Sequence, residues 1–175
     1  MENSKSISVL IANFNWDVSA LIKEIHSQLI STKVPFEILC YDNSKGSALE
    51  TENQKLNDLE NVTYRLEHHH VGRSQNRNKL AQDAKLDWFL FLDGDSSIPN
   101  LNFIEKYLTT SNSAMVVCGG TAYAEKPTDE NCLLRWTYGK QREEISAEKR
   151  NENSNSGFSS FNFLIKREAF ELVGF

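Results

Sequence analysis

The stretch WFLFLDGD, from Trp88 to Asp95, is an unbroken apolar segment that ends on two carboxylates. A continuous run of aromatic and branched residues bounded by turn-forming residues is typical of a strand buried on both faces, as in a parallel sheet covered by helices. Such sheets bind ligands at the carboxyl ends of their strands. The stretch therefore predicts a buried central strand with a site at its end.

The two carboxylates at the end of this run suit a metal ion. If the extended geometry continues, Asp93 and Asp95 lie on the same side of the chain, about 6 to 7 Å apart between their Cα atoms. Gly94 adds no side chain between them, so a ligand can approach the backbone. Two oxygen ligands at this spacing favour Mg²⁺ or Mn²⁺ together with the phosphates of a nucleotide. A polar turn before a helix near Asn100 is the alternative explanation.

Strands and helices alternate along the rest of the chain. The strands expected from apolar runs are 7–11, 36–41, 62–66, 88–92, 114–118 and 161–165, and the expected helices are 18–29, 47–59, 73–86, 103–108 and 167–172. Asp17 is the expected N-cap of the first helix. This alternation predicts an α/β fold with a mainly parallel sheet and helices on both faces. The charged and Asn-rich stretch 140–156 is predicted to be a loop.

Polar residues follow three of these strands. Asn13 and Asn15 follow the first strand, Asp42 ends the second, and the pair Asp93 and Asp95 ends the fourth. Because the carboxyl ends of parallel strands meet at one edge of a sheet, we expect these side chains to lie close together.

Length and composition narrow the possible classes of protein. At 175 residues the chain fits one compact domain. A formal net charge of -5 without a dense basic block argues against nucleic acid as a partner. Three widely spaced cysteines, Cys40, Cys118 and Cys132, are expected to be buried, reduced thiols. No run approaches the length of a membrane span, and the polar N-terminus lacks the pattern of a signal peptide.

The order of motifs resembles the family 2 glycosyltransferases of GT-A fold over nearly the whole chain. The stretches that carry the resemblance are SVLIANFN (8–15), FEILCYDNS (36–44), GRSQNRN (72–78), DGD (93–95) and the segment 162–175. The chain departs from the family pattern in three places. The usual proline of the first motif is absent, Tyr41 replaces the first acid of the second motif, and Asn76 replaces an alanine. The D-x-D element matches without departure.

The resemblance implies a Rossmann-like GT-A fold, with one donor-binding domain over residues 1–175. It also implies that Asp42 accepts a hydrogen bond from the nucleotide base, and that the backbone near Ala12 and Asn13 lines the base pocket. Asn15 belongs to the same donor-binding set.

The resemblance further assigns the charged residues of the site. It implies that Arg73 and Arg77 lie by the donor. Asp95 is expected to bind Mn²⁺ or Mg²⁺, and Asp93 to contact the ribose or a metal-bound water. A divalent ion stabilises the charge that develops on a diphosphate leaving group.

The activity implied is a metal-dependent, inverting transfer of a sugar from a nucleotide-diphospho-sugar, with a UDP-type donor favoured, to a hydroxyl. The acceptor is expected to be a saccharide or lipid-linked, and the location the cytoplasm or the inner face of a membrane. Family members carry an acidic general base after the Gly-Phe pair. No residue here matches it, so we expect the base beyond Phe175 and a domain that lacks its C-terminal part.

Two other functions stay open. The first is a nucleotide-sugar binding module without catalysis. The second is a phosphatase with an aspartyl nucleophile, which requires its Asp-x-Asp loop after the first strand, whereas Asp93 follows the fourth. His68, His69 and His70 are expected to lie in a solvated loop, because consecutive side chains point in different directions.

Overall fold

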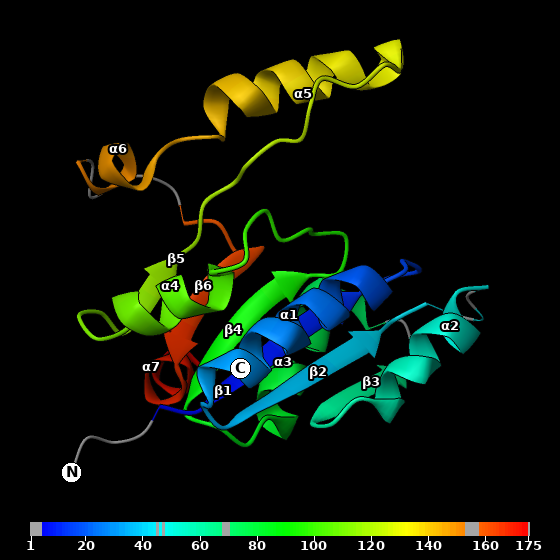
Figure 1. The fold of residues 1–175 in the computed structure, drawn as a ribbon, viewed down its shortest axis with the longest axis vertical. Helices are drawn as coiled ribbons and strands as arrows, with labels where there is room; N and C mark the ends of the chain where they lie inside the picture. The colour runs from blue at the N-terminus through cyan, green and yellow to red at the C-terminus, as the bar shows by residue number, and fades with distance from the viewer. Residues whose placement is uncertain (1–4, 45, 47, 68–70, 153–157, 175) are drawn as a thin grey trace. The chain divides into compact units, whose positions relative to one another are not determined.

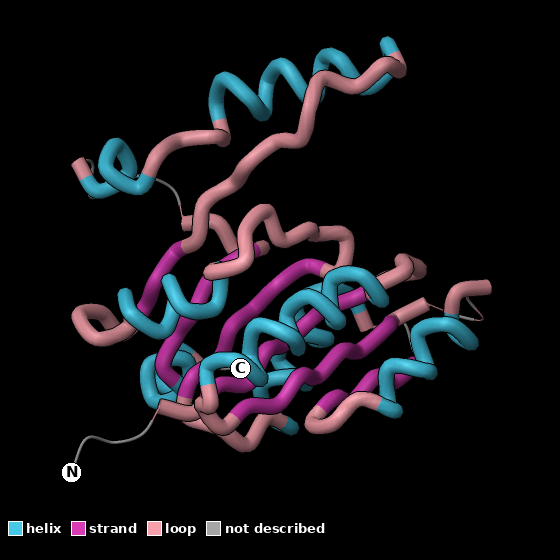
Figure 2. Tube along the Cα trace, viewed as in Figure 1, coloured by secondary structure: helices cyan, strands magenta, loops and turns pink. Residues whose placement is uncertain are grey.

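The computed structural model describes residues 5–44, 46, 48–67, 71–152 and 158–174 (Figures 1 and 2). Its strands are β1 (Ile7–Asn13), β2 (Phe36–Asp42), β3 (Val62–Leu66), β4 (Trp88–Asp93), β5 (Val116–Cys118) and β6 (Asn162–Lys166). Its helices are α1 (Ser19–Thr32), α2 (Glu50–Gln54), the 3-10 helix η1 (Lys55–Asp58), α3 (Gly72–Asp83), α4 (Phe103–Thr110), α5 (Glu130–Arg142), α6 (Ala147–Asn151) and α7 (Arg167–Val173). Among the helices of these residues, none combines the length and the apolar character that a membrane span requires.

The strands form a sheet in the order β3-β2-β1-β4-β6-β5. The neighbours among β3, β2, β1 and β4 run parallel, whereas β6 runs antiparallel to β4. In the parallel register Asn13 lies opposite Asp42, and Ala12 lies opposite Asp93. The prediction of a mainly parallel α/β sheet is therefore confirmed, and the carboxyl ends of β1, β2 and β4 meet at one edge.

Helices cover both faces of this sheet (Figure 1). On one face, Val9 and Ile11 of β1 are buried in a cluster with Ile22 of α1 and Ile104 of α4. On the other face, Leu10 is buried in a cluster to which α3 and α7 contribute. Successive residues of a strand point to opposite faces, so a strand between two helical layers is apolar throughout. This burial on both faces explains the continuous apolar run of β4.

Aromatic side chains of β4 pack against β6 and α7. The ring of Phe91 stacks on Phe163 of β6, with 4.8 Å between the ring centroids, and on Phe170 of α7, with 5.3 Å. The Phe89 ring meets Phe170 edge to face at 5.8 Å. These contacts hold the antiparallel strand and α7 against the parallel part of the sheet.

The chain divides into two compact units, residues 1–117 with 160–175, and residues 118–159. The first unit contains the two apolar clusters. In the second unit, the Tyr123 ring packs directly on Gly139, where a Cβ atom would overlap it. The Trp136 indole donates a hydrogen bond to Ala124 O at 2.9 Å. The expectation of a single donor-binding domain stays a prediction.

The prediction of a loop over residues 140–156 is wrong for residues 140–142 and 147–151, which are helical. Helix α5 continues to Arg142, and α6 begins after Ser146, whose hydroxyl accepts a hydrogen bond from the backbone N–H of Lys149. Glu, Lys, Arg and Gln favour helix, and an exposed helix does not need a regular apolar stripe. The sequence therefore forms helix here without the periodicity by which helices are recognised.

Other boundaries also differ from the prediction. The expected helix 47–59 is a short α2 followed by η1, and the expected helix 73–86 ends at Asp83. The N-cap of α1 is Val18, although Asp17 Oδ1 does accept a hydrogen bond from Ser19 N–H at 2.8 Å.

The expectation of buried thiols holds only in part. All three cysteines are free, but Cys40 is buried, Cys118 is partly exposed and Cys132 is exposed. Cys132 lies in α5, an element that the apolar pattern did not define. Strand β5 is also not the buried strand predicted, because it lies at the edge of the sheet and 42% of Val116 is exposed.

Candidate functional site

Asp42, the last residue of β2, is fully buried at the edge of the sheet where the parallel strands have their carboxyl ends. Its Oδ2 accepts hydrogen bonds from Asn13 Nδ2 at 2.7 Å and from the Tyr64 hydroxyl at 3.1 Å. Its Oδ1 accepts from the backbone N–H groups of Asn15 at 3.2 Å and Ser44 at 2.9 Å. Four donors fill the acceptor positions that a carboxylate offers. Asp42 therefore links the ends of β1 and β2 to β3.

Amide side chains fix the loop between β1 and α1. Asn13 Nδ2 also donates to Trp16 O at 3.0 Å, and Asn53 Nδ2 donates to the same oxygen at 2.9 Å. Asn53 Oδ1 in turn accepts from Val18 N–H at 3.2 Å. Within this loop Asn15 has a positive φ of 51°, which asparagine tolerates better than most residues. The loop keeps Asn13 buried and leaves Asn15 exposed.

The end of β4 touches the end of β1 through its backbone. Ala12 O accepts a hydrogen bond from Gly94 N–H at 3.1 Å, and Ser96 N–H donates to Asp93 O at 3.1 Å. The chain therefore turns after Asp93, and the extended geometry expected through Asp95 does not continue. A Cβ atom on Gly94 would overlap the Asn13 amide. The glycine is thus required by the close approach of Asn13.

Two arginines of α3 hold the carboxylate of Asp93. Arg77 Nη2 lies 2.6 Å from Asp93 Oδ1, and Arg73 pairs with Oδ2. The Arg77 side chain is 12% exposed and that of Arg73 is 57% exposed. Burial raises the pKa of Asp93 above its usual value, although both guanidinium groups oppose this shift. Burial also lowers the pKa of Arg77. The ion pair between Asp93 and Arg77 is therefore costly to bury, and the attraction between the two opposite charges offsets this cost.

The metal expected at the D-x-D element has a limited set of protein ligands. Asp95 is exposed in the turn after β4, whereas Asp93 is already engaged by the two arginines. In the part of the chain that is described, no group of three or more His, Cys, Asp or Glu side chains forms a metal site. Mg²⁺ and Mn²⁺ nevertheless bind through one or two carboxylates when substrate phosphates supply further ligands. The residues present fit a metal shared with a phosphate group.

Buried polar atoms without a partner gather at the same edge. Among the described residues, the buried side-chain atoms that lack a hydrogen bond are Asn13 Oδ1, Asn43 Oδ1, Ser44 Oγ, Asn76 Oδ1 and Arg77 Nε. Buried polar groups are normally satisfied, so such atoms indicate a ligand or ordered water. These five atoms come from the strand ends and from the helix that the sequence pointed to.

Most residues at these strand ends are predictable from the sequence, but several residues of the site are not. Asn76 Nδ2 donates to Tyr41 O at 2.9 Å, which ties α3 to β2. Its position inside the GRSQNRN motif was the available signal. By contrast, Asn53 and Tyr64 carried no signal, because their roles depend on the folding of α2 and β3 over the loop. His68, His69 and His70 lie outside the described residues.

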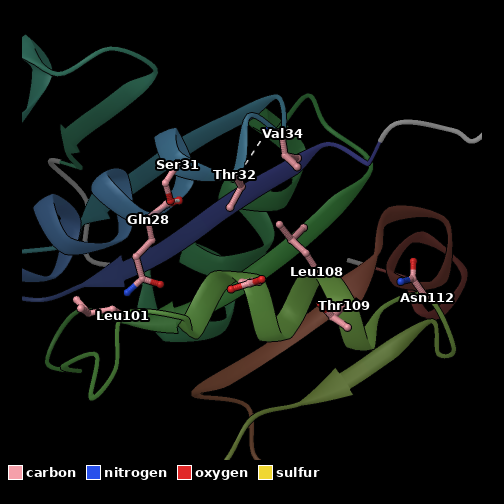
Figure 3. A pocket seen from close by; sticks show the side chains of 9 residues that line it. Gln28, Ser31, Thr32, Val34, Leu101, Leu108, Thr109 and Asn112 are labelled. Carbon is pink, nitrogen blue, oxygen red and sulfur yellow. Dashed lines mark hydrogen bonds between the residues drawn. The ribbon is translucent and has the colours of Figure 1, made fainter.

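A separate pocket lies between α1 and α4 (Figure 3). Its volume is about 480 Å³, and it is lined by Gln28, Ser31 and Thr32 from α1 and by Leu108 and Thr109 from α4, among others. None of the residues predicted for donor or metal binding lines it. The predicted site is thus the strand edge and not this pocket.

A family model described as Glycosyl transferase family 2 matches residues 8–174. No curated protein gives a significant match.

Two solved structures resemble the whole chain. One is the mannosyltransferase PcManGT from Pyrobaculum calidifontis in complex with GDP-Man and Mn²⁺, with 19% identity and a TM-score of 0.58. The other is S. aureus TarS 1-349 in complex with UDP-GlcNAc, with 16% identity and a TM-score of 0.63. Each match covers 96% of this chain, and 46% and 47% of the respective solved chains. The chain therefore has the fold of these proteins and spans about half their length.

Proposed function

The chain belongs to glycosyl transferase family 2, and from this premise we propose that it transfers a sugar from a nucleotide-diphospho-sugar to an acceptor hydroxyl, with a divalent cation and with inversion at the sugar carbon. The observation that carries the proposal is the convergence of Asp42, Asp93 and Asp95 at one edge of the sheet, among buried polar atoms without partners. Donor-binding sites of open α/β sheets lie at such an edge.

In this proposal the ends of β1 and β2 bind the nucleoside. The backbone at Ala12 and Asn13 lines the base pocket, and Asn15 is the exposed polar residue beside it. Asp42 contributes to base binding. Because its four acceptor positions are filled, a contact between Asp42 and the base requires that one of the present donors moves away. Of the two hydrogen bonds to Oδ2, the one from the Tyr64 hydroxyl is longer than the one from Asn13.

The charged residues serve the diphosphate. Asp95 is the proposed metal ligand and Asp93 the proposed contact to the ribose or to a metal-bound water, with Arg73 and Arg77 beside the donor. The cation supplies Lewis-acid stabilisation of the leaving diphosphate. Support comes from the exposure of Asp95 and from the general fit of carboxylates to Mg²⁺ and Mn²⁺. PcManGT was solved with Mn²⁺, and the proposal extends this cation to the present chain.

We favour a UDP-type donor and a saccharide or lipid-linked acceptor, in the cytoplasm or at the inner face of a membrane. The acidic general base of the transfer is not assigned to any residue. A binding module without turnover is the second candidate, because the chain spans less than half of the two solved structures.

Sugar release separates the two candidates. The chain is incubated with UDP-GlcNAc or GDP-Man and Mn²⁺, and free UDP or GDP is measured with and without saccharide acceptors. Release that requires Mn²⁺ and is lost in Asp95→Ala supports the transferase. Binding of the nucleotide-sugar without any release supports the module, and failure to bind either donor contradicts both.

A further inference from the structure

We propose that Arg73 is the residue that receives the donor diphosphate, and that it does so by exchanging Asp93 for a phosphate oxygen. This inference rests on the proposed function and specifies which group of the site meets the anion. Arg73 and Arg77 lie one turn apart on α3, so their side chains share one face of the helix. Each pairs with a different oxygen of Asp93.

The two arginines are not equivalent. One guanidinium is enough to neutralise one carboxylate, and Arg77 is the buried partner at 2.6 Å. Arg73 is the more exposed partner, and its ion pair contributes less to stability than that of Arg77 because water competes for the Arg73 guanidinium. The exchange of Asp93 for another anion as the partner of Arg73 therefore costs little free energy. Arg77 stays in place and keeps Asp93 neutralised during the exchange.

The surroundings of Arg73 favour a phosphate. Gly72 begins α3 with a φ of +78°, Val71 provides no side-chain cap, and no acidic residue occupies the first turn. Among the residues that the structure describes, no acidic or capping side chain therefore lies before the backbone N–H groups of this turn, which favours a bound anion. Arg77 Nε is in addition a buried donor without a partner among the described residues. Guanidinium groups bind phosphate through paired hydrogen bonds, which suits a diphosphate.

The exchange has a consequence for the role of the metal. A diphosphate held by Arg73 keeps part of its affinity when the cation is removed, because the guanidinium charge does not depend on Asp95. The proposed metal then adds to this affinity and does not create all of it.

The test is calorimetric titration of the chain with UDP, inorganic pyrophosphate and uridine in EDTA. In Arg73→Gln, we expect UDP and pyrophosphate to bind about tenfold more weakly and uridine to bind as in the wild type. Arg73→Lys, which keeps the charge but not the paired geometry, is expected to fall between the two. Lys79→Gln is the matched control, because Lys79 is an exposed cation of the same helix that pairs with Asp83.

If the wild-type chain binds UDP in Mn²⁺ but not in EDTA, Arg73 does not hold the diphosphate without the metal, and the inference is overturned while the donor site stands. If Arg73→Gln binds UDP as the wild type does, or loses uridine as strongly as UDP, the inference is overturned while the donor site stands. An equal loss in Lys79→Gln would assign the effect to general charge and would also overturn it. If the wild-type chain binds neither UDP nor GDP in Mn²⁺ or in EDTA, the proposed function itself fails, and the inference with it.

Discussion

Asp95 is the exposed member of the D-x-D element, and none of the ion pairs among the described residues includes it. Asp95→Ala is expected to abolish the Mn²⁺-dependent part of UDP binding, because it removes the proposed metal ligand. The substitution lies in an exposed turn, so the free energy of unfolding is expected to stay within about 0.5 kcal/mol of the wild type. Calorimetry with and without Mn²⁺, together with urea unfolding, measures both effects.

Asp58→Ala serves as the control for this prediction, because Asp58 is an exposed carboxylate on η1, the 3-10 helix that precedes β3. It should leave UDP binding and its response to Mn²⁺ unchanged. Retained Mn²⁺ dependence in Asp95→Ala would refute the assignment of the metal ligand.

Asp42 is the buried acid of the site. Asp42→Ala is expected to weaken uridine and UDP more than pyrophosphate, because the base pocket loses its acidic contact. It also leaves four donors without an acceptor, which is expected to cost roughly 2–5 kcal/mol of stability. Titration with the three ligands and urea unfolding give the two quantities.

The matched control for Asp42 is Asn53→Ala. Asn53 holds the same loop through Trp16 O and Val18 N–H, but it donates no hydrogen bond to Asp42. If Asn53→Ala produces the same preference for pyrophosphate, the effect of Asp42 comes from the position of the loop. Equal losses of uridine and pyrophosphate in Asp42→Ala would contradict a base contact.

At the scale of elements, the contact between the turn after β4 and the end of β1 fixes the site. Gly94→Ala is expected to push the Asn13 amide away from Asp42 and to destabilise the protein by about 1–3 kcal/mol. UDP binding should weaken as well. Gly120→Ala is the control, since the nearest atom to its added Cβ lies at 3.6 Å, an ordinary contact. Equal stability of the two variants would show that the close approach of Asn13 has no energetic importance.

The elements that the sequence predicted well are those buried between two helical layers. β1, β2 and β4 were recognised because burial on both faces requires continuous apolar residues. The elements predicted poorly lie at the edge of the sheet or in the second unit. β5 has little cover, and α5 and α6 are rich in charged residues, so neither burial nor periodicity marks their boundaries.

The site was predictable to the level of which strand ends meet, since parallel register brings Asn13 opposite Asp42 and Ala12 opposite Asp93. The partners of each side chain were not predictable. The pairing of Asp93 with two arginines depends on the rotation of α3, and the saturation of Asp42 depends on Tyr64 from β3. Contacts between elements distant in sequence are set by packing, which a linear pattern does not record.

For the whole molecule, the two units are expected to differ in local stability. Almost all fully buried apolar side chains belong to the first unit, whereas α5 and α6 expose most of their residues. Amide protons of β1 and β4 should therefore exchange with deuterium far more slowly than those of α5. Hydrogen exchange followed by mass spectrometry measures this. Strand β2 serves as the internal reference for a central strand. Similar protection of the amide protons in α5 and β4 would contradict the expected difference in local stability.

The most direct test of the account is a calorimetric titration of the intact chain with UDP, first in Mn²⁺ and then in EDTA. The edge formed by β1, β2 and β4 is proposed to bind a nucleoside diphosphate, so we expect UDP to bind in both conditions and more tightly with Mn²⁺. GDP is titrated in parallel. The absence of binding of either nucleotide in both conditions would contradict the account.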